Sequence, residues 1–338
     1  MGRIIGIDLG TTNTVVCVIQ DGEPKVITTR EGLTHIPSVV CYDTEDDLFY
    51  CGQAAKDWMP KEPKNTVYSV KRLMGMHFFD EVRRDGENQN DRNRFFQIER
   101  KVGYRLRPDP EGRDDVVRIL LGEEKYFKPE QISAMILKQA KEDAERFLNG
   151  EEVTGAVITV PAYFEEKQIA ATHEAGKLAG LDVKHILKEP TAAAIAAGYN
   201  QNVQNRYVLV YDLGGGTFDV SLLQMNDNNF TVDGLGGNNW LGGDNFDEEL
   251  VTLAAENVRA SHNYDPLNEP EFRTRIKRHV EFAKQQLSET RNTVIGAMDV
   301  CTVPVDREKG KRRKPVSVNL PVSRDTFEEK IRHYIVET

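Results

Sequence analysis

The chain has 338 residues and a formal net charge of −10, with 39% hydrophobic and 29% charged residues. This length can form a large core divided between two lobes. The negative charge disfavours nucleic acid as a partner, because phosphate backbones select basic surfaces. The sequence shows no signal peptide and no long apolar run, so we expect a cytoplasmic protein without a membrane partner.

The four cysteines, Cys17, Cys41, Cys51 and Cys301, lack the C-x-x-C spacing of zinc sites. Cys17 lies in an apolar run, where a reduced and packed thiol is expected. The cysteine pattern therefore agrees with a reducing compartment and predicts no structural metal.

The N-terminal residues predict a strand, a polar loop and a second strand. An apolar run from Arg3 leads to Asp8-Leu9-Gly10-Thr11-Thr12-Asn13, and a second apolar run ends at Val18. The loop offers backbone N–H groups, hydroxyls and one carboxylate. These groups suit a phosphate and a hydrated cation.

The next elements expected are a strand over 37–42 and a short capped helix over 65–75 that ends at Gly75. Lys71 lies in this helix and, taken alone, predicts only a solvated side chain. Residues 80–94 are almost wholly polar and indicate a solvated excursion.

From residue 129 the pattern alternates between helices and strands. A helix from Pro129 to about Asn149 precedes a buried strand over 157–160, a second helix over 165–179 and a strand over 183–188. This alternation predicts an α/β architecture with a mostly parallel sheet. Glu189 follows the last strand and opens an alanine-rich helix. It fits either chemistry at a strand end or a carboxylate that stabilises a helix N-terminus.

A second strand–loop–strand unit lies about two hundred residues after the first. The run 207–211 predicts a strand buried on both faces, and Gly214-Gly215-Gly216-Thr217 follows it between Asp212 and Asp219. Alone, this loop could be a glycine-rich hairpin with solvated aspartates. This loop repeats the strand–loop–strand pattern of the first loop. The two loops together therefore predict a site that binds a polyphosphate from both sides, with magnesium.

The last part predicts a glycine-rich loop over 234–243 and a helix capped by Asp244 or Asn245. A helix over 272–289 carries an apolar face and a separate polar stripe. The stripe could bind a ribose and base, but plain surface charge patterning is favoured without other evidence. Two strands over 299–305 and 315–320 enclose a basic hairpin tip, and a final helix follows from Asp325. The polar stripe of the helix over 272–289 consists of Glu281, Lys284, Gln285 and Ser288.

Four motifs in this order resemble the N-terminal ATPase domain of the seventy-kilodalton heat-shock chaperones of the DnaK type. They are the residues from Ile7 to Asn13, Val160–Phe164, Glu189–Ala194 and Asp212–Asp219. The resemblance implies an actin-like, sugar-kinase-like fold, with two lobes of duplicated core around a nucleotide cleft. Lobe I would span 1–200 with a smaller subdomain at about 38–128, and lobe II would span 201–338 with one at about 237–322.

The resemblance also implies the roles of individual residues. Asp8 and Asp212 would bind Mg²⁺ largely through water, and a potassium ion would lie near Asp219. Lys71 would approach the γ-phosphate and the attacking water, and Glu189 would orient water or metal. Asp8, Asp212 and Thr217 complete the catalytic set. The ATP- or ADP-binding residues would be Gly10, Thr11, Thr12, Asn13, Gly214, Gly215, Gly216, Gly242, Gly243, Glu281, Lys284, Gln285 and Ser288.

Gln285 departs from the family pattern, because many members have there an arginine that stacks on adenine. The chain also ends before the last adenosine motif, the returning half of lobe II and the peptide-binding domain. It therefore resembles an incomplete ATPase domain. The implied partners are a J-domain protein and a nucleotide-exchange factor, with unfolded clients bound only through the missing domain. A small-molecule kinase on the same fold and a non-catalytic member are the alternatives.

Overall fold

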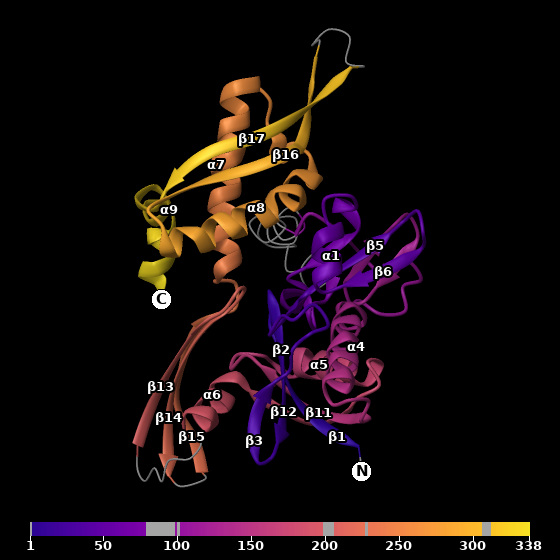
Figure 1. Cartoon of the computed structure of the whole chain (residues 1–338), viewed down its shortest axis with the longest axis vertical. Coiled ribbons are helices and arrows are strands. Elements are labelled where there is room, and N and C mark those ends of the chain that lie inside the picture. The colour runs from indigo at the N-terminus through magenta and orange to yellow at the C-terminus, as the bar shows by residue number, and fades with distance from the viewer. Residues whose placement is uncertain (1, 79–98, 100–101, 199–205, 227–228, 306–311) are drawn as a thin grey trace.

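A computed structural model describes residues 2–78, 99, 102–198, 206–226, 229–305 and 312–338. The polar segment predicted at 80–94 and most of the predicted basic hairpin tip lie outside these residues. The two ends of the chain lie in different parts of the molecule (Figure 1).

The first sheet has the strand order β12-β11-β1-β2-β3, with β4 paired to β2. Its centre is parallel where β1 lies against β11 and β11 against β12, whereas β2 and β3 run antiparallel. The prediction of a mostly parallel sheet is therefore wrong. A loop as short as 10–12 can only reverse the chain, because a parallel connection needs a crossover of a dozen or more residues. The strands are β1 (Arg3–Leu9), β2 (Asn13–Gln20), β3 (Glu23–Val26), β4 (Ile36–Pro37), β11 (Val153–Val160) and β12 (Asp182–Lys188).

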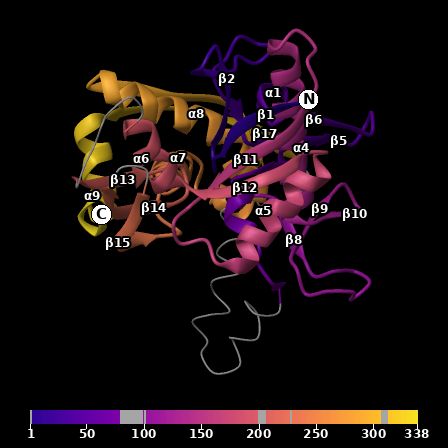
Figure 2. The same cartoon turned by 90° about the horizontal axis from the view of Figure 1, so that it is seen from below.

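Three helices connect and cover this sheet (Figure 2). Helix α4 (Pro129–Phe147) packs a fully buried apolar face on β1, β2 and β11. It ends before Asn149, whose left-handed backbone (φ 56°) stops the helix. Helices α5 (Glu166–Leu178) and α6 (Glu189–Gly198) confirm the predicted alternation. Helix α6 contacts β11 and β12 on one side and β13 and β14 on the other.

Two small antiparallel sheets flank the first sheet. One has the order β6-β5-β7 and the other β10-β9-β8. The helix predicted over 65–75 is wrong: the segment forms β7 between two short 3₁₀ turns. Ser69 has a left-handed backbone (φ 53°), which interrupts any helix there. These elements are β5 (Val39–Asp43), β6 (Leu48–Cys51), α1 (Gln53–Trp58), η1 (Pro63–Asn65), β7 (Thr66–Tyr68), η2 (Val70–Leu73), β8 (Arg105–Arg107), β9 (Arg118–Leu121) and β10 (Lys125–Phe127).

The second strand–loop–strand unit lies in an antiparallel sheet of β13 (Arg206–Leu213), β14 (Phe218–Asn226) and β15 (Asn229–Asn238). Strand β13 is an edge, and Tyr207, Leu209 and Tyr211 are 62%, 66% and 53% exposed. The prediction of two buried faces is therefore wrong in this structure. Helix α6 covers only the face that carries Val208 and Val210.

The C-terminal part is an α/β unit with its own core. Its elements are α7 (Gly243–His262), η4 (Pro266–Asn268), α8 (Pro270–Glu289), β16 (Asn292–Pro304), β17 (Arg313–Ser323) and α9 (Arg324–Glu337). The predicted helix, hairpin and final helix are confirmed, and Phe327 and Ile331 are buried in this core. Helix α7 begins after Gly242, earlier than a cap residue at Asp244 or Asn245 would place it. Asn245 still takes part in the cap, because its Oδ1 accepts from the Gly242 N–H at 3.2 Å.

Candidate functional site

The two predicted phosphate loops meet in space. A Cβ placed on Gly215 would collide with Thr12, and one on Gly216 would lie 2.6 Å from the Thr11 Cγ2. The loop between β1 and β2 therefore faces the loop between β13 and β14 at contact distance. Only glycine allows this close approach of the two loops.

Each loop is fixed by a neighbouring segment that the sequence did not single out for this role. The Ser38 hydroxyl donates to the Gly10 carbonyl at 2.8 Å, and the Ser38 N–H donates to the Thr12 carbonyl at 2.8 Å. On the other side, the Gly243 and Asp244 N–H groups donate to the Gly214 and Gly215 carbonyls at 3.0 and 2.8 Å. The predicted residue Gly243 thus supports the second loop directly.

Gly242 has no room for a side chain. A Cβ there would lie 2.6 Å from the Gly215 carbonyl carbon, 2.6 Å from the Gly216 nitrogen and 2.7 Å from the Gly214 oxygen. Its extended backbone (φ 175°) is one that any residue adopts, so only this close approach requires glycine. The start of α7 is consequently packed against the backbone of the second loop.

Four predicted acidic residues and Lys71 share one electrostatic environment. The Lys71 Nζ donates to the Glu189 Oε1 at 2.6 Å, with side chains only 7% and 13% exposed. Burial raises the pKa of Glu189, with Lys71 opposing and Asp8 and Asp212 adding to the rise. Burial and Asp8 likewise raise the pKa of Asp212. Since the carboxylates repel one another, a cation among them would be stabilising.

Asp219 lies directly across from Asp212 on the neighbouring strand. It is 2% exposed, and neither carboxylate oxygen accepts a hydrogen bond from a described residue. Burial, followed by Asp212, raises the pKa of Asp219 to about 6, against Lys71, Lys188 and the nearby Ala162 amide. An unpartnered buried carboxylate is costly, so this position fits a bound cation.

The donor set also indicates how a cation would be held. Among the described residues, no three His, Cys, Asp or Glu side chains lie close enough to ligate one metal ion. A Mg²⁺ ion keeps several of its waters when carboxylates and phosphates bind it. Asp8, whose Oδ1 accepts from the Thr159 hydroxyl at 2.9 Å, and Asp212 therefore fit a hydrated ion rather than a fully protein-ligated one.

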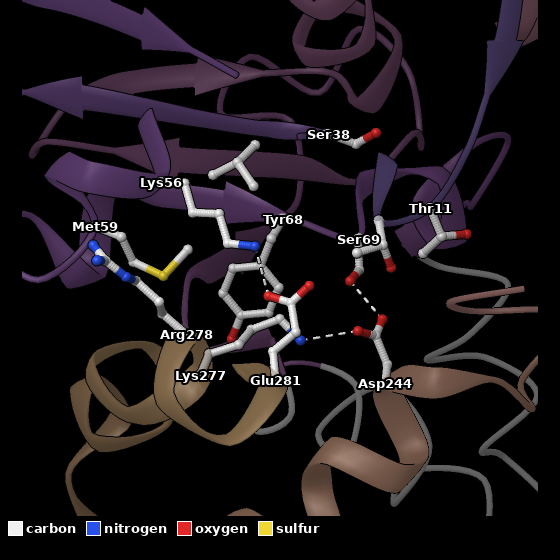
Figure 3. A pocket seen from close by; sticks show the side chains of 12 residues that line it. Thr11, Ser38, Lys56, Met59, Tyr68, Ser69, Asp244, Lys277, Arg278 and Glu281 are labelled. Atoms are coloured by element: carbon white, nitrogen blue, oxygen red, sulfur yellow. Dashed lines mark hydrogen bonds and ion pairs between the residues drawn. The ribbon is translucent and has the colours of Figure 1, made fainter. Parts of the chain in front are cut away.

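Further along the cleft, polar bridges connect the N-terminal segments to α7 and α8 (Figure 3). The Lys56 Nζ pairs with the Glu281 Oε2 at 2.7 Å, and the Ser69 hydroxyl donates to the Asp244 Oδ2 at 2.6 Å. Lys277 bonds the other oxygen of Asp244 at 2.9 Å. Burial opposes the shift, but Lys277 and Arg72 lower the pKa of Asp244 to about 2. These residues and the first loop line a narrow cavity of about 20 Å³.

The predicted polar stripe of α8 is only partly turned toward this cleft. Glu281 is buried, and the Lys284 Nζ contacts the Asp247 Oδ1 at 2.7 Å and the Gly243 carbonyl at 3.2 Å. Gln285 and Ser288 are exposed. The structure therefore brings Glu281 and Lys284 to the site and leaves the other two on the surface beside it.

Arg72 also joins the site, although nothing in the sequence distinguished it from other surface cations. Its guanidinium donates to the Gly216 carbonyl at 3.2 and 3.0 Å and to the Asn245 Oδ1 at 2.9 Å. It also lies 5.7 Å from the ring centre of Trp240. Ser38, Lys56, Ser69 and Lys277 were missed for the same reason: each stands in an ordinary polar context. Only Asp244 could have been suspected from the sequence, because it follows the predicted nucleotide-binding residues Gly242 and Gly243.

Two hydroxyl- and glycine-lined loops face a group of carboxylates and a buried lysine at the junction of two α/β units. This arrangement defines a nucleotide-binding ATPase class of site.

Comparison with known proteins gives the family. The model of the Hsp70 protein family matches residues 4–338, so the chain belongs to this family. The fold is therefore the actin-like ATPase fold, built around a nucleotide-binding core.

Several chaperones named DnaK are similar over nearly the whole chain. The chain is 40% identical to Chaperone protein DnaK 3 of a Synechococcus species, over 97% of this chain and 46% of the relative. It is 41% identical to Chaperone protein dnaK1 of a Synechocystis species, over 100% of this chain and 45% of the relative. It is 39% identical to Chaperone protein dnaK of Cyanidium caldarium, over 99% of this chain and 50% of the relative.

The chain thus spans about half the length of the curated relatives it matches. In the part of the chain that the structure describes, no helix combines the length and apolar character needed to cross a membrane.

Proposed function

We propose that this chain is the ATP-binding and ATP-hydrolysing module of a molecular chaperone that assists protein folding. The supporting observation is the meeting of the two phosphate loops beside the buried Lys71–Glu189 pair. We keep the two-lobe division, with lobe I at 1–200 and lobe II at 201–338, as part of this proposal.

The cleft residues would act mainly by binding and positioning. The N–H groups and hydroxyls of Gly10–Asn13 and Gly214–Thr217 would hold the β- and γ-phosphates from opposite sides. Lys71 would stabilise the charge that develops as water attacks the γ-phosphorus and the bond to the ADP oxygen breaks. Glu189, which fixes the Lys71 ammonium at 2.6 Å, would keep that cation in place and orient the water.

Asp8 and Asp212 would hold Mg²⁺ through water, and Asp219 would face a potassium ion. When bound, these ions neutralise phosphate charge. Glu281 and Lys284 would border the adenosine side of the cleft, with Gln285 and Ser288 on its rim. Because Gln285 is exposed and neutral, it would contribute little stacking energy to adenine.

In the whole protein, ATP and ADP states would control a peptide-binding domain that takes unfolded clients. A J-domain protein would stimulate hydrolysis and an exchange factor would release ADP, in the cytoplasm. The family name supports this setting, and the DnaK relatives are named as chaperones.

The experiment that tests this function compares the chain with Lys71→Ala in single-turnover ATP hydrolysis. We expect the variant to be slower by roughly 100-fold or more, because a preorganised cation at the developing charge is lost. Its affinity for Mg-ADP, measured by calorimetry, should change little. Lys64→Ala is the matched control, since it removes a lysine paired to a glutamate, Glu271, and neither residue lines the cavity at the phosphate loops.

Equal hydrolysis by the chain and the Lys71→Ala variant would contradict the proposed role of Lys71. ADP production that requires an added sugar would instead indicate a small-molecule kinase. Tight binding of Mg-ATP with no turnover in the parent chain would indicate a non-catalytic member.

A further inference from the structure

A short turn after β11 lies beside the site, and the proposed function gives it no role. It consists of Pro161, Ala162, Tyr163 and Phe164, and we call it the 161–164 turn. The turn closes on itself, because the Phe164 N–H donates to the Pro161 carbonyl at 3.2 Å. None of its side chains carries a charge. Its position therefore depends on what its rings and its backbone contact.

The 161–164 turn borders two of the groups proposed to act in hydrolysis. The Phe164 ring is buried, and its centre lies 5.8 Å from the Lys71 Nζ, within the range of a cation–π contact. The Ala162 amide lies close enough to Asp219 to lower the pKa of that carboxyl. The turn is thus next to the lysine proposed at the γ-phosphate and to the carboxylate proposed at a cation.

The Tyr163 ring connects the same turn to the second sheet. A Cβ placed on Gly237 would lie 3.0 Å from the Tyr163 Cε2, so the ring packs against the backbone of β15. Gly237 is the residue that pairs with Asp219 of β14. A shift of the turn would therefore move a ring that packs beside the strand position of Asp219.

Lys188 fixes this turn from the neighbouring strand. It is the last residue of β12, pairs with Val160 in the parallel register of β11 and β12, and directly precedes Glu189. The Lys188 Nζ donates to the Phe164 carbonyl at 2.8 Å and to the Pro161 carbonyl at 3.3 Å. One side chain therefore holds both ends of the turn.

The surroundings of Lys188 favour a charged side chain that is held in place. Lys188 is partly buried. Burial lowers its pKa, whereas the carboxylates of Asp219 and Glu189 raise it. These carboxylates favour the ammonium form, whose hydrogen bonds to carbonyl oxygens are stronger than those of a neutral amine.

We propose that Lys188 is a positioning residue for ATP hydrolysis. Its ammonium fixes the 161–164 turn, and the turn keeps Lys71 and Asp219 in the geometry that the reaction needs. Glu189 holds Lys71 directly, and its neighbour Lys188 acts on the same lysine through the turn. This inference rests on the proposed ATP hydrolysis. Since a misplacement of about 1 Å can slow a reaction about 100-fold, loss of this support should lower the rate of cleavage.

The test removes the ammonium and keeps the apolar stem of the side chain. Lys188→Met deletes both hydrogen bonds to the turn, whereas Lys188→Arg keeps a charged donor. Lys184→Met is the matched control, because Lys184 is exposed on the same strand and pairs with Asp182 at its far end. In single-turnover ATP cleavage we expect Lys188→Met to be roughly ten-fold slower than this control, with unchanged Mg-ADP affinity. Lys188→Arg should regain most of the rate.

Two outcomes of the cleavage assay would overturn the proposal. One is parent-like cleavage by Lys188→Met. The other is a Lys188→Arg variant as slow as Lys188→Met, because the charged donor would then make no difference.

A second measurement separates this inference from the proposed function. Hydrogen exchange, followed by mass spectrometry of peptides that contain the 161–164 turn, needs no nucleotide. The Phe164 amide should exchange roughly ten-fold faster in Lys188→Met than in the Lys184→Met control, because the turn loses its support. Equal exchange would refute the role of Lys188. A parent chain that cleaves no ATP would contradict the proposed function, yet this exchange would still decide whether Lys188 holds the turn.

Discussion

The two strand–loop–strand units have the same sequence pattern but different surroundings. In β1 the inward residues Ile5 and Ile7 are 1% and 2% exposed. In β13 the inward residues Val208 and Val210 are only partly buried, and Leu209 on the other face is 66% exposed. The same local pattern thus lies in a dense core in one case and at a sheet edge in the other.

The covering helices explain this difference. Strand β1 lies between β11 and β2 and beneath α4, a helix of 19 residues. Among the described residues, strand β13 has one neighbouring strand, β14, and is covered by the 10-residue α6. Because burial stabilises roughly in proportion to covered apolar area, the first unit is held much more firmly than the second. The first phosphate loop is therefore the fixed side of the site.

The largest expected effect tests whether β1 is more deeply buried than β13. Ile7→Ala should lower the free energy of unfolding by about 2–5 kcal/mol, because it leaves a cavity under α4. Leu209→Ala, which removes a mostly exposed side chain, should cost less than about 1 kcal/mol. Urea unfolding of both variants measures the difference. Equal losses would mean that β13 is covered in solution.

The next effect concerns Asp219 on the second unit. Its pKa is raised from 3.8 to about 6, so folding favours the protonated form and stability is lost as the pH rises from about 4 to 6. Without added cations, Asp219→Asn should therefore raise the free energy of unfolding at pH 7 by up to about 3 kcal/mol. At pH 3 the two chains should be equally stable.

Thermal unfolding in a chelator at the two pH values measures this effect. Added Mg²⁺ or K⁺ should stabilise the parent chain more than the variant. A variant that is less stable than the parent at pH 7 would show that the Asp219 carboxylate is well solvated or paired in solution.

The smallest expected effect tests how the second loop is supported. In Gly242→Ala the new methyl would meet the backbone of Gly214–Gly216, so the loop must shift. We expect roughly ten-fold weaker Mg-ADP binding by calorimetry, corresponding to about 1.4 kcal/mol. Gly236→Ala is the control, because a Cβ there meets nothing within 4 Å. Unchanged affinity in Gly242→Ala would mean that the support is not needed.

The sequence predicted the parts of the site whose chemistry is local. A carboxylate, glycines and hydroxyls at the end of an apolar strand are groups that suit phosphate wherever the strand lies, so Asp8–Asn13 and Asp212–Asp219 could be proposed as phosphate loops from the sequence alone. The long helices α4, α5 and α8 were also predictable, because apolar spacing and end signals act within one segment.

Only the tertiary structure decided which side chains complete the site and which strands are buried. Arg72, Ser69 and Lys277 look like ordinary polar residues until distant segments place them against Gly216 and Asp244. The burial of β13 likewise depends on what covers it, and no feature of residues 206–213 encodes that. Phosphate-binding chemistry is a property of a few consecutive residues, whereas burial and charge pairing depend on neighbours far along the chain.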